Sequence, residues 1–252
     1  MPAENHFSFG VVIQTMMLMI RHTVFVLGLL LVPIVNASQL VGQAKLYPEV
    51  ITYDVYRKGE PVGHYTLRFS DITNDRVAAE IEMELTAKVF GFFNYEYRYQ
   101  AKEVWQNDRL TQLNVKTVSN KKESLVTAVQ KSDVLETVDK KGRVHAYPAE
   151  LMTTHHWYRQ ILDQKQVLNS ITGNMDEISP QSVGSALLDA SGETVQLDGY
   201  RLGGDLERTV SWYDRDGRWR ALEFRAKDGS DIQVIWSGGR LIKETSLAQN
   251  RE

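Results

Sequence analysis

Two adjacent histidines, His155 and His156, are the side chains best suited to bind a metal, because neutral imidazole is a common metal ligand. Neighbouring residues on a helix point about 100° apart, so this pair could not face one ion. His64 and His145 show none of the ligand spacings of zinc sites. The sequence contains no cysteine, which excludes thiol chemistry, disulfides and a lipid-anchored lipoprotein. We therefore expect neither a metal nor a cofactor.

Several acidic residues lie in predicted turns. Asp214 and Asp216 precede Gly217, and Asp228 precedes Gly229. In such turns a carboxylate commonly accepts hydrogen bonds from backbone amides. The sequence has no G-x-S-x-G motif, no phosphate-binding loop and no recognisable order of Ser, His and Asp, so an enzyme is not the favoured interpretation. The alternative is a hydrolase that uses some of His64, Asp205, Glu207 and Asp214.

An aromatic column is the feature most compatible with ligand binding. Three tyrosines alternate with Glu96 and Arg98, so a strand here would place the tyrosines on one face. Such a column either packs as ordinary sheet core or lines an apolar pocket in which the hydroxyl groups orient a bound molecule. Under the second interpretation the ligand-binding residues are Tyr95, Tyr97, Tyr99, Trp105, Trp157, Trp212 and Trp219. Both interpretations stay open.

The elements that would position these side chains are mostly strands. From residue 49 onward, segments of alternating polarity are separated by turn dipeptides, with the clearest alternation over 76–87. Helical spacing occurs over 153–162, with Thr153 or Thr154 as the N-cap. We predict a mainly β fold, a curved antiparallel sheet or incomplete barrel of about thirteen strands with one short central helix.

The beginning of the chain is typical of a secretory signal peptide. Arg21 precedes the apolar run 23–35, and the small residues Asn36, Ala37 and Ser38 follow it. We expect cleavage between Ala37 and Ser38, after which the mature protein would be in the periplasm.

The point at which translation starts affects this interpretation. A start at Met1 would leave 11–35 roughly long enough to span a bilayer as an uncleaved anchor, although Arg21 lies inside it. A later start makes Arg21 the positive flank of a signal peptide, and the candidates are Met16, Met17 and Met19. The expected organisation is a signal peptide (1–37), a linker (38–48), a single all-β domain (49–246) and a polar tail (247–252).

The charges of the chain argue against nucleic acid as a partner and against an outer-membrane barrel as the fold. The formal net charge is -3, and removal of 1–37 takes away one acid and one base, so no electrostatic footprint for nucleic acid remains. The strands carry charges where lipid-facing residues would lie, and 247–252 has no aromatic girdle, which argues against an outer-membrane barrel. We do not expect an integral membrane protein after cleavage.

The segment WYDRDGRW at 212–219, followed by Phe224 and by DGS at 228–230, resembles an uncharacterised family of exported proteobacterial β proteins known only as a domain of unknown function. Tyr53, Gly59, Gly63 and the Thr172-Gly173 pair carry the same resemblance, which covers residues 49–236. It implies a periplasmic β fold and no catalytic residues. Lys122 stands where the family pattern favours a turn glycine. In architecture the chain also looks like lipoprotein-carrier half barrels, whose members bind acyl chains.

These observations favour a periplasmic binding or carrier protein for an amphipathic ligand, either lipid-like or a small aromatic molecule. The first alternative is an envelope protein–protein interaction module with a filled core, which would meet its partner through a sheet edge or an apolar patch. The hydrolase is the second alternative.

Overall fold

The computed structural model describes residues 38–89, 93–190, 192–226 and 228–243. The predicted signal peptide (1–37), with Ala37 at the predicted cleavage bond, and the predicted tail (247–252) lie outside these residues. Among the helices that are described, none has the length and apolar character needed to cross a bilayer.

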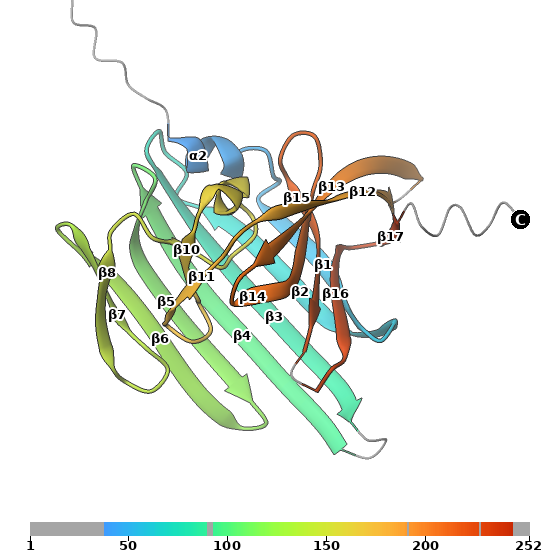
Figure 1. Ribbon diagram of the computed structural model, residues 1–252, viewed down its shortest axis with the longest axis horizontal. Coiled ribbons are helices and arrows are strands. Elements are labelled where there is room, and N and C mark those ends of the chain that lie inside the picture. The colour runs from blue at the N-terminus through green and yellow to red at the C-terminus, as the bar shows by residue number, and fades with distance from the viewer. Residues whose placement is uncertain (1–37, 90–92, 191, 227, 244–252) are drawn as a thin grey trace, which may run out of the picture. The chain divides into compact units, whose positions relative to one another are not determined.

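Strands dominate the described chain, and fourteen of them form one sheet (Figure 1). In spatial order the sheet contains β17 (Gly239–Lys243), β12 (Gln181–Ala190), β13 (Glu193–Gly203), β14 (Leu206–Tyr213), β15 (Trp219–Arg225), β16 (Asp231–Trp236), β1 (Val50–Arg57), β2 (Glu60–Ser70), β3 (Arg76–Val89), β4 (Phe93–Gln106), β5 (Arg109–Ser119), β6 (Lys122–Lys131), β7 (Val134–Val138) and β8 (Val144–Pro148). A second sheet of three strands comprises β11 (Met175–Glu177), β10 (Gln166–Leu168) and β9 (Met152–Thr153).

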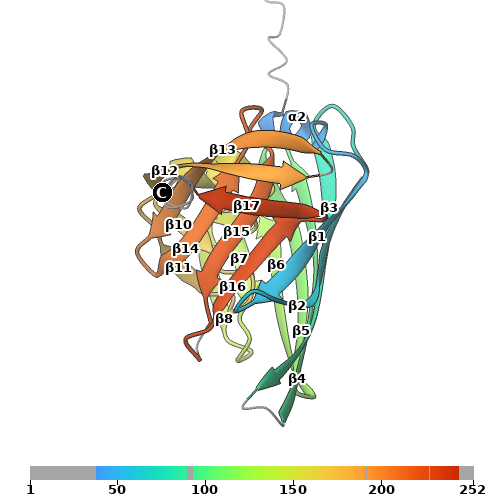
Figure 2. The same ribbon diagram turned by 90° about the vertical axis from the view of Figure 1, so that its right-hand side faces the viewer.

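Every neighbouring pair in the large sheet is antiparallel, and most pairs are consecutive hairpins. Two pairs are not consecutive in the sequence, β12 with β17 and β1 with β16. In the second pair, which joins β12–β17 to β1–β8, Tyr53 lies opposite Trp236. The order ends at β17 and β8, which do not pair with each other, so the sheet is not closed. Figure 2 shows that the sheet is curved. The predicted mainly β fold, an incomplete barrel built from a curved antiparallel sheet, is therefore confirmed.

The alternation of polarity accounts for the two faces of the sheet. In β3, Val77 and Ile81 are fully buried, whereas Glu82 and Glu84 are exposed. We call the face that carries Val77 and Ile81 the inner face. The segment 149–180, which contains the second sheet, packs against it.

The predicted turns use backbone conformations that suit their residues. Gly59, Gly217 and Gly229 all have positive φ, of 82°, 83° and 80°. Lys122 is the first residue of β6, and the left-handed positions of its hairpin are Asn120 (φ 47°) and Lys121 (φ 69°). A glycine at 122 is therefore not required by this turn.

The segment predicted as a helix, 153–162, contains a short 3-10 helix, η1 (Arg159–Asp163), at its end. The predicted N-cap is wrong. Thr153 belongs to β9, where it pairs with Leu168, and the residue that precedes η1 is Tyr158, which makes no side-chain cap. The apolar spacing that suggested an α-helix instead reflects burial of Trp157, Tyr158 and Ile161, which are all fully buried.

The stretch 38–48, expected to be a linker, contains the helix α2 (Gln39–Ala44). Ser38 is its N-cap, because the Ser38 side chain accepts a hydrogen bond from the amide of Val41 at 3.1 Å. Leu40 and Ala44 are each 1% exposed and belong to the main core. This part of the chain is therefore folded against the sheet.

The buried apolar residues form two clusters. The larger one fills the inner face between the large sheet and the segment 149–180. The smaller one lies where β12 and β13 pack near β15 and β16, and it consists of Ala186, Leu188, Leu197, Trp212, Ala221 and Ile235.

Candidate functional site

The inner face of β2 to β5 carries side chains in rows that cross the strands. The most buried row is at most 2% exposed and consists of Phe69, Ala79, Glu103 and Leu113. Toward the connection between β3 and β4, the next row contains Leu67, Ile81, Ala101 and Val115. The third row contains Tyr65, Met83, Tyr99 and Thr117. The fourth, which we call the hairpin-side row, is half-buried throughout and consists of Gly63, Leu85, Tyr97 and Ser119. Burial therefore decreases from the row that contains Glu103 to the hairpin-side row.

At the buried end, the carboxylate of Glu103 is enclosed by four side chains. Its Oε1 accepts a hydrogen bond from the Thr153 hydroxyl at 2.5 Å and lies 2.7 Å from Nδ1 of His155. Its Oε2 accepts hydrogen bonds from the indole N–H groups of Trp105 (3.2 Å) and Trp157 (3.1 Å). A carboxylate without solvent contact needs such partners to remain ionised.

Two opposing effects determine the pKa of Glu103. Burial raises the pKa, whereas the charge of His155 and the hydrogen bonds from His155, Thr153 and Trp157 lower it. The lowering effects prevail, so the pKa of Glu103 lies below its usual value and the carboxylate is charged at neutral pH.

His155 connects this network to a second residue of β4, Tyr99, and through it to Ser170. Its Nε2 lies 2.7 Å from the hydroxyl of Tyr99, which donates a hydrogen bond to Oγ of Ser170 at 2.9 Å. His155, Tyr99 and Ser170 are 5%, 4% and 3% exposed. A substrate could reach these three hydrogen-bonded side chains only by displacing the protein groups that cover them. The network therefore holds the 149–180 segment on the sheet.

The structure separates the seven predicted ligand-binding residues into different environments. Tyr99, Trp105 and Trp157 contact the Glu103 network and are core residues. Trp219 is fully buried in an aromatic cluster, with its ring 4.4 Å from Tyr53 and 5.6 Å from His156 between centroids. These residues support the interpretation as sheet core.

Trp212 belongs to the second cluster, which contains none of the other six residues. It pairs with Gly199, and a Cβ on that glycine would lie 2.5 Å from the Trp212 ring. Its indole N–H donates to Glu223 at 3.0 Å.

Tyr95 and Tyr97 are the two predicted residues that remain half-buried. Their rings are stacked, with centroids 6.4 Å apart and an angle of 16° between planes. The Tyr95 hydroxyl lies 3.1 Å from Oγ of Ser119. Leu85 of β3, which pairs with Tyr97, is half-buried as well.

Sequence reasoning missed Glu103, Thr153 and Ser170 as members of the buried network. For Glu103 a signal was present, because it stands on the same side of β4 as Tyr97, Tyr99 and Trp105. A charged residue on the apolar face of a strand points to a buried partner. The partner, His155, could not be identified without the fold.

The acidic turn residues stabilise backbone structure, as predicted for Asp214 and Asp228. Oδ1 of Asp214 accepts hydrogen bonds from the amides of Asp216 (3.0 Å) and Arg218 (2.9 Å), and Oδ1 of Asp228 accepts one from Ser230 (3.0 Å). The turn at 139–143 has the same D-x-x-G-R sequence as 214–218. There, Oδ1 of Asp139 accepts from two amides in the same way.

The residues proposed for a hydrolase are not brought together. His64 lies 3.2 Å from Asp54 on the exposed side of β2. Asp214 is paired with Arg218 and Arg220, each at 2.8 Å, and Asp205 accepts from the Glu177 amide at 2.8 Å. His155 and His156 have separate surroundings, since His156 stacks on Trp219. In the described parts of the chain, no three His, Asp or Glu side chains converge as metal ligands would.

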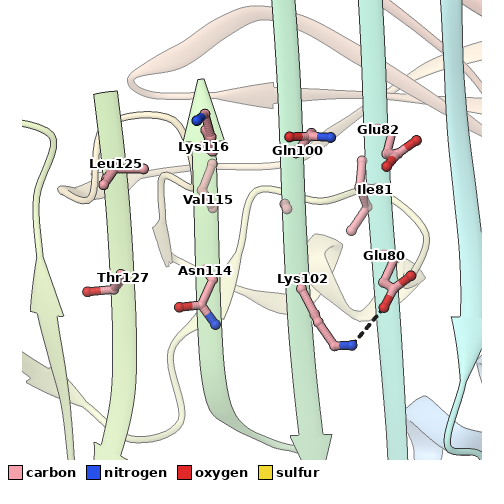
Figure 3. Close-up of a pocket in the computed structure, with 11 residues that line it drawn as sticks. Glu80, Ile81, Glu82, Gln100, Lys102, Asn114, Val115, Lys116, Leu125 and Thr127 are labelled. Atoms are coloured by element: carbon pink, nitrogen blue, oxygen red, sulfur yellow. Dashed lines mark hydrogen bonds and ion pairs between the residues drawn. The ribbon is translucent and has the colours of Figure 1, made fainter. Parts of the chain in front are cut away.

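A shallow hollow of about 420 Å³ lies over β3 to β6 (Figure 3). Its polar lining is a ladder of side chains that includes Glu82, Gln100 and Asn114, and Lys102 is paired with Glu80 at 2.7 Å. Lys116, which also lines it, is paired with Glu123 at 2.8 Å. Both lysines therefore already have partners on the solvated sheet surface.

Comparison with known proteins identifies relatives of the fold but no activity. Residues 53–241 match the family described as "Domain of unknown function (DUF6134)". A crystal structure described as a β-barrel-like protein of domain of unknown function DUF1849 from Brucella abortus aligns with a TM-score of 0.52 and 12% identity, over 76% of this chain and 96% of that one. At this identity the likeness extends to the fold alone.

A putative outer membrane lipoprotein-sorting protein domain from Vibrio parahaemolyticus aligns over 85% of this chain and 97% of that one, with a TM-score of 0.23 and 8% identity. A TM-score this low does not demonstrate a shared fold. No curated protein matches the sequence significantly.

Proposed function

Because the chain belongs to the family described as domain of unknown function DUF6134, which carries no assigned activity, we propose its function from the geometry of the inner face. The protein is a binding or carrier protein for an amphipathic ligand and acts in the periplasm after export. The ligand lies along the hairpin-side row, with Tyr95 and Tyr97 beside it.

The gradient of burial along the inner face carries this proposal. The Glu103 row is closed by protein, whereas Leu85 and Tyr97 in the hairpin-side row are half-buried although they continue the same apolar surface. Met83, in the third row, is also only partly buried. An acyl chain or aromatic ring placed here would extend the core by removing apolar area from water.

Hydroxyl groups in the same place can orient the polar end of the ligand. Burial raises the pKa of Tyr97 to about 12, so its hydroxyl keeps its proton at neutral pH and can donate a hydrogen bond. The Tyr95 hydroxyl and Ser119 lie 3.1 Å apart and offer a second polar position. This combination of apolar surface and few polar groups is typical of small-molecule sites.

The structure around Ser38 is compatible with export and cleavage after Ala37. Oδ1 of Asp108 accepts hydrogen bonds from the Ser38 hydroxyl (2.5 Å) and the Leu40 amide (2.9 Å). Ser38 itself caps α2. A chain cut between residues 37 and 38 keeps all of these contacts.

Binding of a dansyl-labelled undecanoic acid tests the proposal. We expect the purified protein to bind this probe, and Leu85→Asn to weaken binding at least about tenfold, equivalent to about 1.4 kcal/mol. Leu125→Asn is the matched control, because Leu125 is 56% exposed on β6. Native mass spectrometry of protein isolated from the periplasm would show a bound lipid. A bare mass together with no probe binding would overturn the proposal.

The sheet edges favour the interaction module as a second candidate. β8 ends the order of the large sheet, and Val144 on this strand is 66% exposed. An edge strand can pair with a strand of a partner. A photo-crosslinking residue at 144 would then capture one defined envelope protein, and Val144→Lys would abolish assembly with it.

A further inference from the structure

A polar pocket of about 550 Å³ lies where α2, η1 and the connection between β14 and β15 meet. Gln43 of α2 donates a hydrogen bond to the carbonyl oxygen of Gly217 at 2.9 Å, which ties the helix to that connection. Gln43 is 8% exposed. The volume of the pocket is within the range of small-molecule sites.

Arg159 contributes a positive charge that no carboxylate neutralises among the described residues. Its Nη2 donates to the hydroxyl of Tyr200 at 2.7 Å, and its guanidinium carbon lies 5.5 Å from the centre of the Tyr200 ring. Both contacts are with a neutral side chain. They fix the guanidinium in the pocket lining and leave its charge available.

Arg215 is the second arginine of the lining, and it is also held by a neutral partner. Its Nη2 donates to Oε1 of Gln196 at 3.0 Å. By contrast, Arg218 and Arg220 on the same hairpin are both paired with Asp214 at 2.8 Å. The hairpin therefore carries two arginines that are paired with a carboxylate and one, Arg215, that makes no ion pair with a described residue.

The acidic residues of the lining do not cancel this charge. Asp216 is paired with Arg218 at 2.8 Å. Asp163 is exposed at the C-terminal end of η1. Arg159 and Arg215 thus face one acid, Asp163, that is not paired with an arginine. With the neighbouring Arg218, Arg220 and Asp214 counted, four arginines stand beside three aspartates, an excess of one positive charge.

Gln160 adds an independent indication of a ligand. Its Oε1 is buried in the pocket lining and has no hydrogen-bond partner in the described residues. Buried acceptors are nearly always satisfied. If the Gln160 side chain turns toward the pocket, Oε1 can accept a hydrogen bond from an N–H or O–H group of a bound molecule.

We propose that this pocket binds a small organic carboxylate that also carries a hydroxyl or amino group. Arg159 and Arg215 bind the carboxylate through charge-assisted hydrogen bonds, and Gln160 accepts a hydrogen bond from the hydroxyl or amino group. None of these residues belongs to the hairpin-side row. The site is therefore separate from the proposed amphipathic-ligand site, and either can fail without the other.

Isothermal titration of the folded protein with L-malate, succinate and inorganic phosphate tests the proposal. We expect L-malate to bind with a Kd below about 1 mM and succinate, which lacks the hydroxyl group, to bind more weakly. Arg159→Gln and Arg215→Gln should each weaken L-malate binding at least about tenfold. Gln160→Leu should remove the preference for L-malate over succinate.

Arg201→Gln is the matched control, because Arg201 is exposed and follows Tyr200 on β13 but does not line the pocket. It should leave binding unchanged, which would show that net charge alone is not responsible. Circular dichroism confirms that each variant is folded, and Arg215→Gln changes an exposed tip residue if Arg159→Gln proves unstable. The proposal is overturned if neither carboxylate binds at 10 mM, if phosphate binds as tightly as L-malate, or if Arg201→Gln weakens binding equally.

Discussion

Oε1 of Glu103 and Nδ1 of His155 lie 2.7 Å apart, although Glu103 is on the long strand β4 and His155 is on the segment that crosses the inner face. Glu103 is 0% and His155 5% exposed. Breaking a buried pair leaves an uncompensated charge, which is strongly destabilising. This contact therefore fixes the 149–180 segment at one place on the sheet.

Replacing Glu103 with Gln should lower the free energy of unfolding by about 3 to 5 kcal/mol, because His155 loses its charged partner inside the protein. Urea unfolding followed by circular dichroism measures this change. Glu82→Gln on the exposed side of β3 is the control and should change stability by less than about 0.5 kcal/mol. Equal effects of the two substitutions would show that the buried pair contributes nothing specific.

His156 predicts a dependence of stability on pH. Burial, followed by the charge of His155, lowers the pKa of His156 from 6.5 to about 3, so the folded protein keeps this ring neutral. As pH falls below 6.5, the unfolded chain binds a proton that the folded protein does not. The free energy of unfolding should therefore decrease by about 1.4 kcal/mol per pH unit from this residue between pH 6.5 and 3.

Urea unfolding of His156→Phe between pH 7.5 and 5 measures this contribution. The substitution keeps an aromatic ring against Trp219 and removes the titrating group, so the decrease should become shallower than in the original protein. A slope in His156→Phe equal to that of the original protein would contradict the assignment.

Local patterns predicted the large sheet well because each strand and turn carries its own signal. The alternation in 76–87 and the glycine turns at 217 and 229 depend only on neighbouring residues. The Glu103 network depends on contacts between residues 50 or more positions apart, such as Thr153 with Glu103. No local pattern records those contacts, and the short segment around Trp157 was accordingly predicted as an α-helix.

Contacts between distant residues also explain why the predicted ligand-binding residues differ in burial. Tyr97 and Tyr99 stand on one face of β4, as the alternation indicated, yet Tyr99 is 4% exposed and Tyr97 is half-buried. The difference arises from His155 and Ser170, which cover Tyr99. The alternation predicted which residues share a face of β4, whereas the residues that bury Tyr99 come from a distant segment of the chain.

Gly199 is expected to tolerate no side chain. A Cβ at this position would lie 2.5 Å from the Trp212 ring, so Gly199→Ala must displace that ring and should destabilise the protein by about 1 to 3 kcal/mol. Differential scanning calorimetry would measure a lower Tm. Gly42→Ala in α2 is the matched control, since nothing lies within 4 Å of its Cβ, and it should be neutral or stabilising by up to about 1 kcal/mol.

Asp108 is expected to control the beginning of α2. Its carboxylate accepts hydrogen bonds from the Ser38 hydroxyl and the amides of Gln39 and Leu40. Asp108→Ala should therefore lower stability by about 1 to 2 kcal/mol and increase amide hydrogen exchange in Gln39–Ala44 first. Asp133→Ala, at an exposed residue between β6 and β7, should change neither quantity. Unchanged exchange in Asp108→Ala would contradict this role.

A closed barrel has a fixed circumference, because each strand is hydrogen-bonded on both sides. Here β8 and β17 do not pair with each other, so the described sheet is an arc whose radius is set by side-chain packing. Small changes in that radius break no ladder hydrogen bond. The arc can therefore widen beside Leu85 and Tyr97, and the proposed amphipathic-ligand site lies on this adjustable part of the sheet.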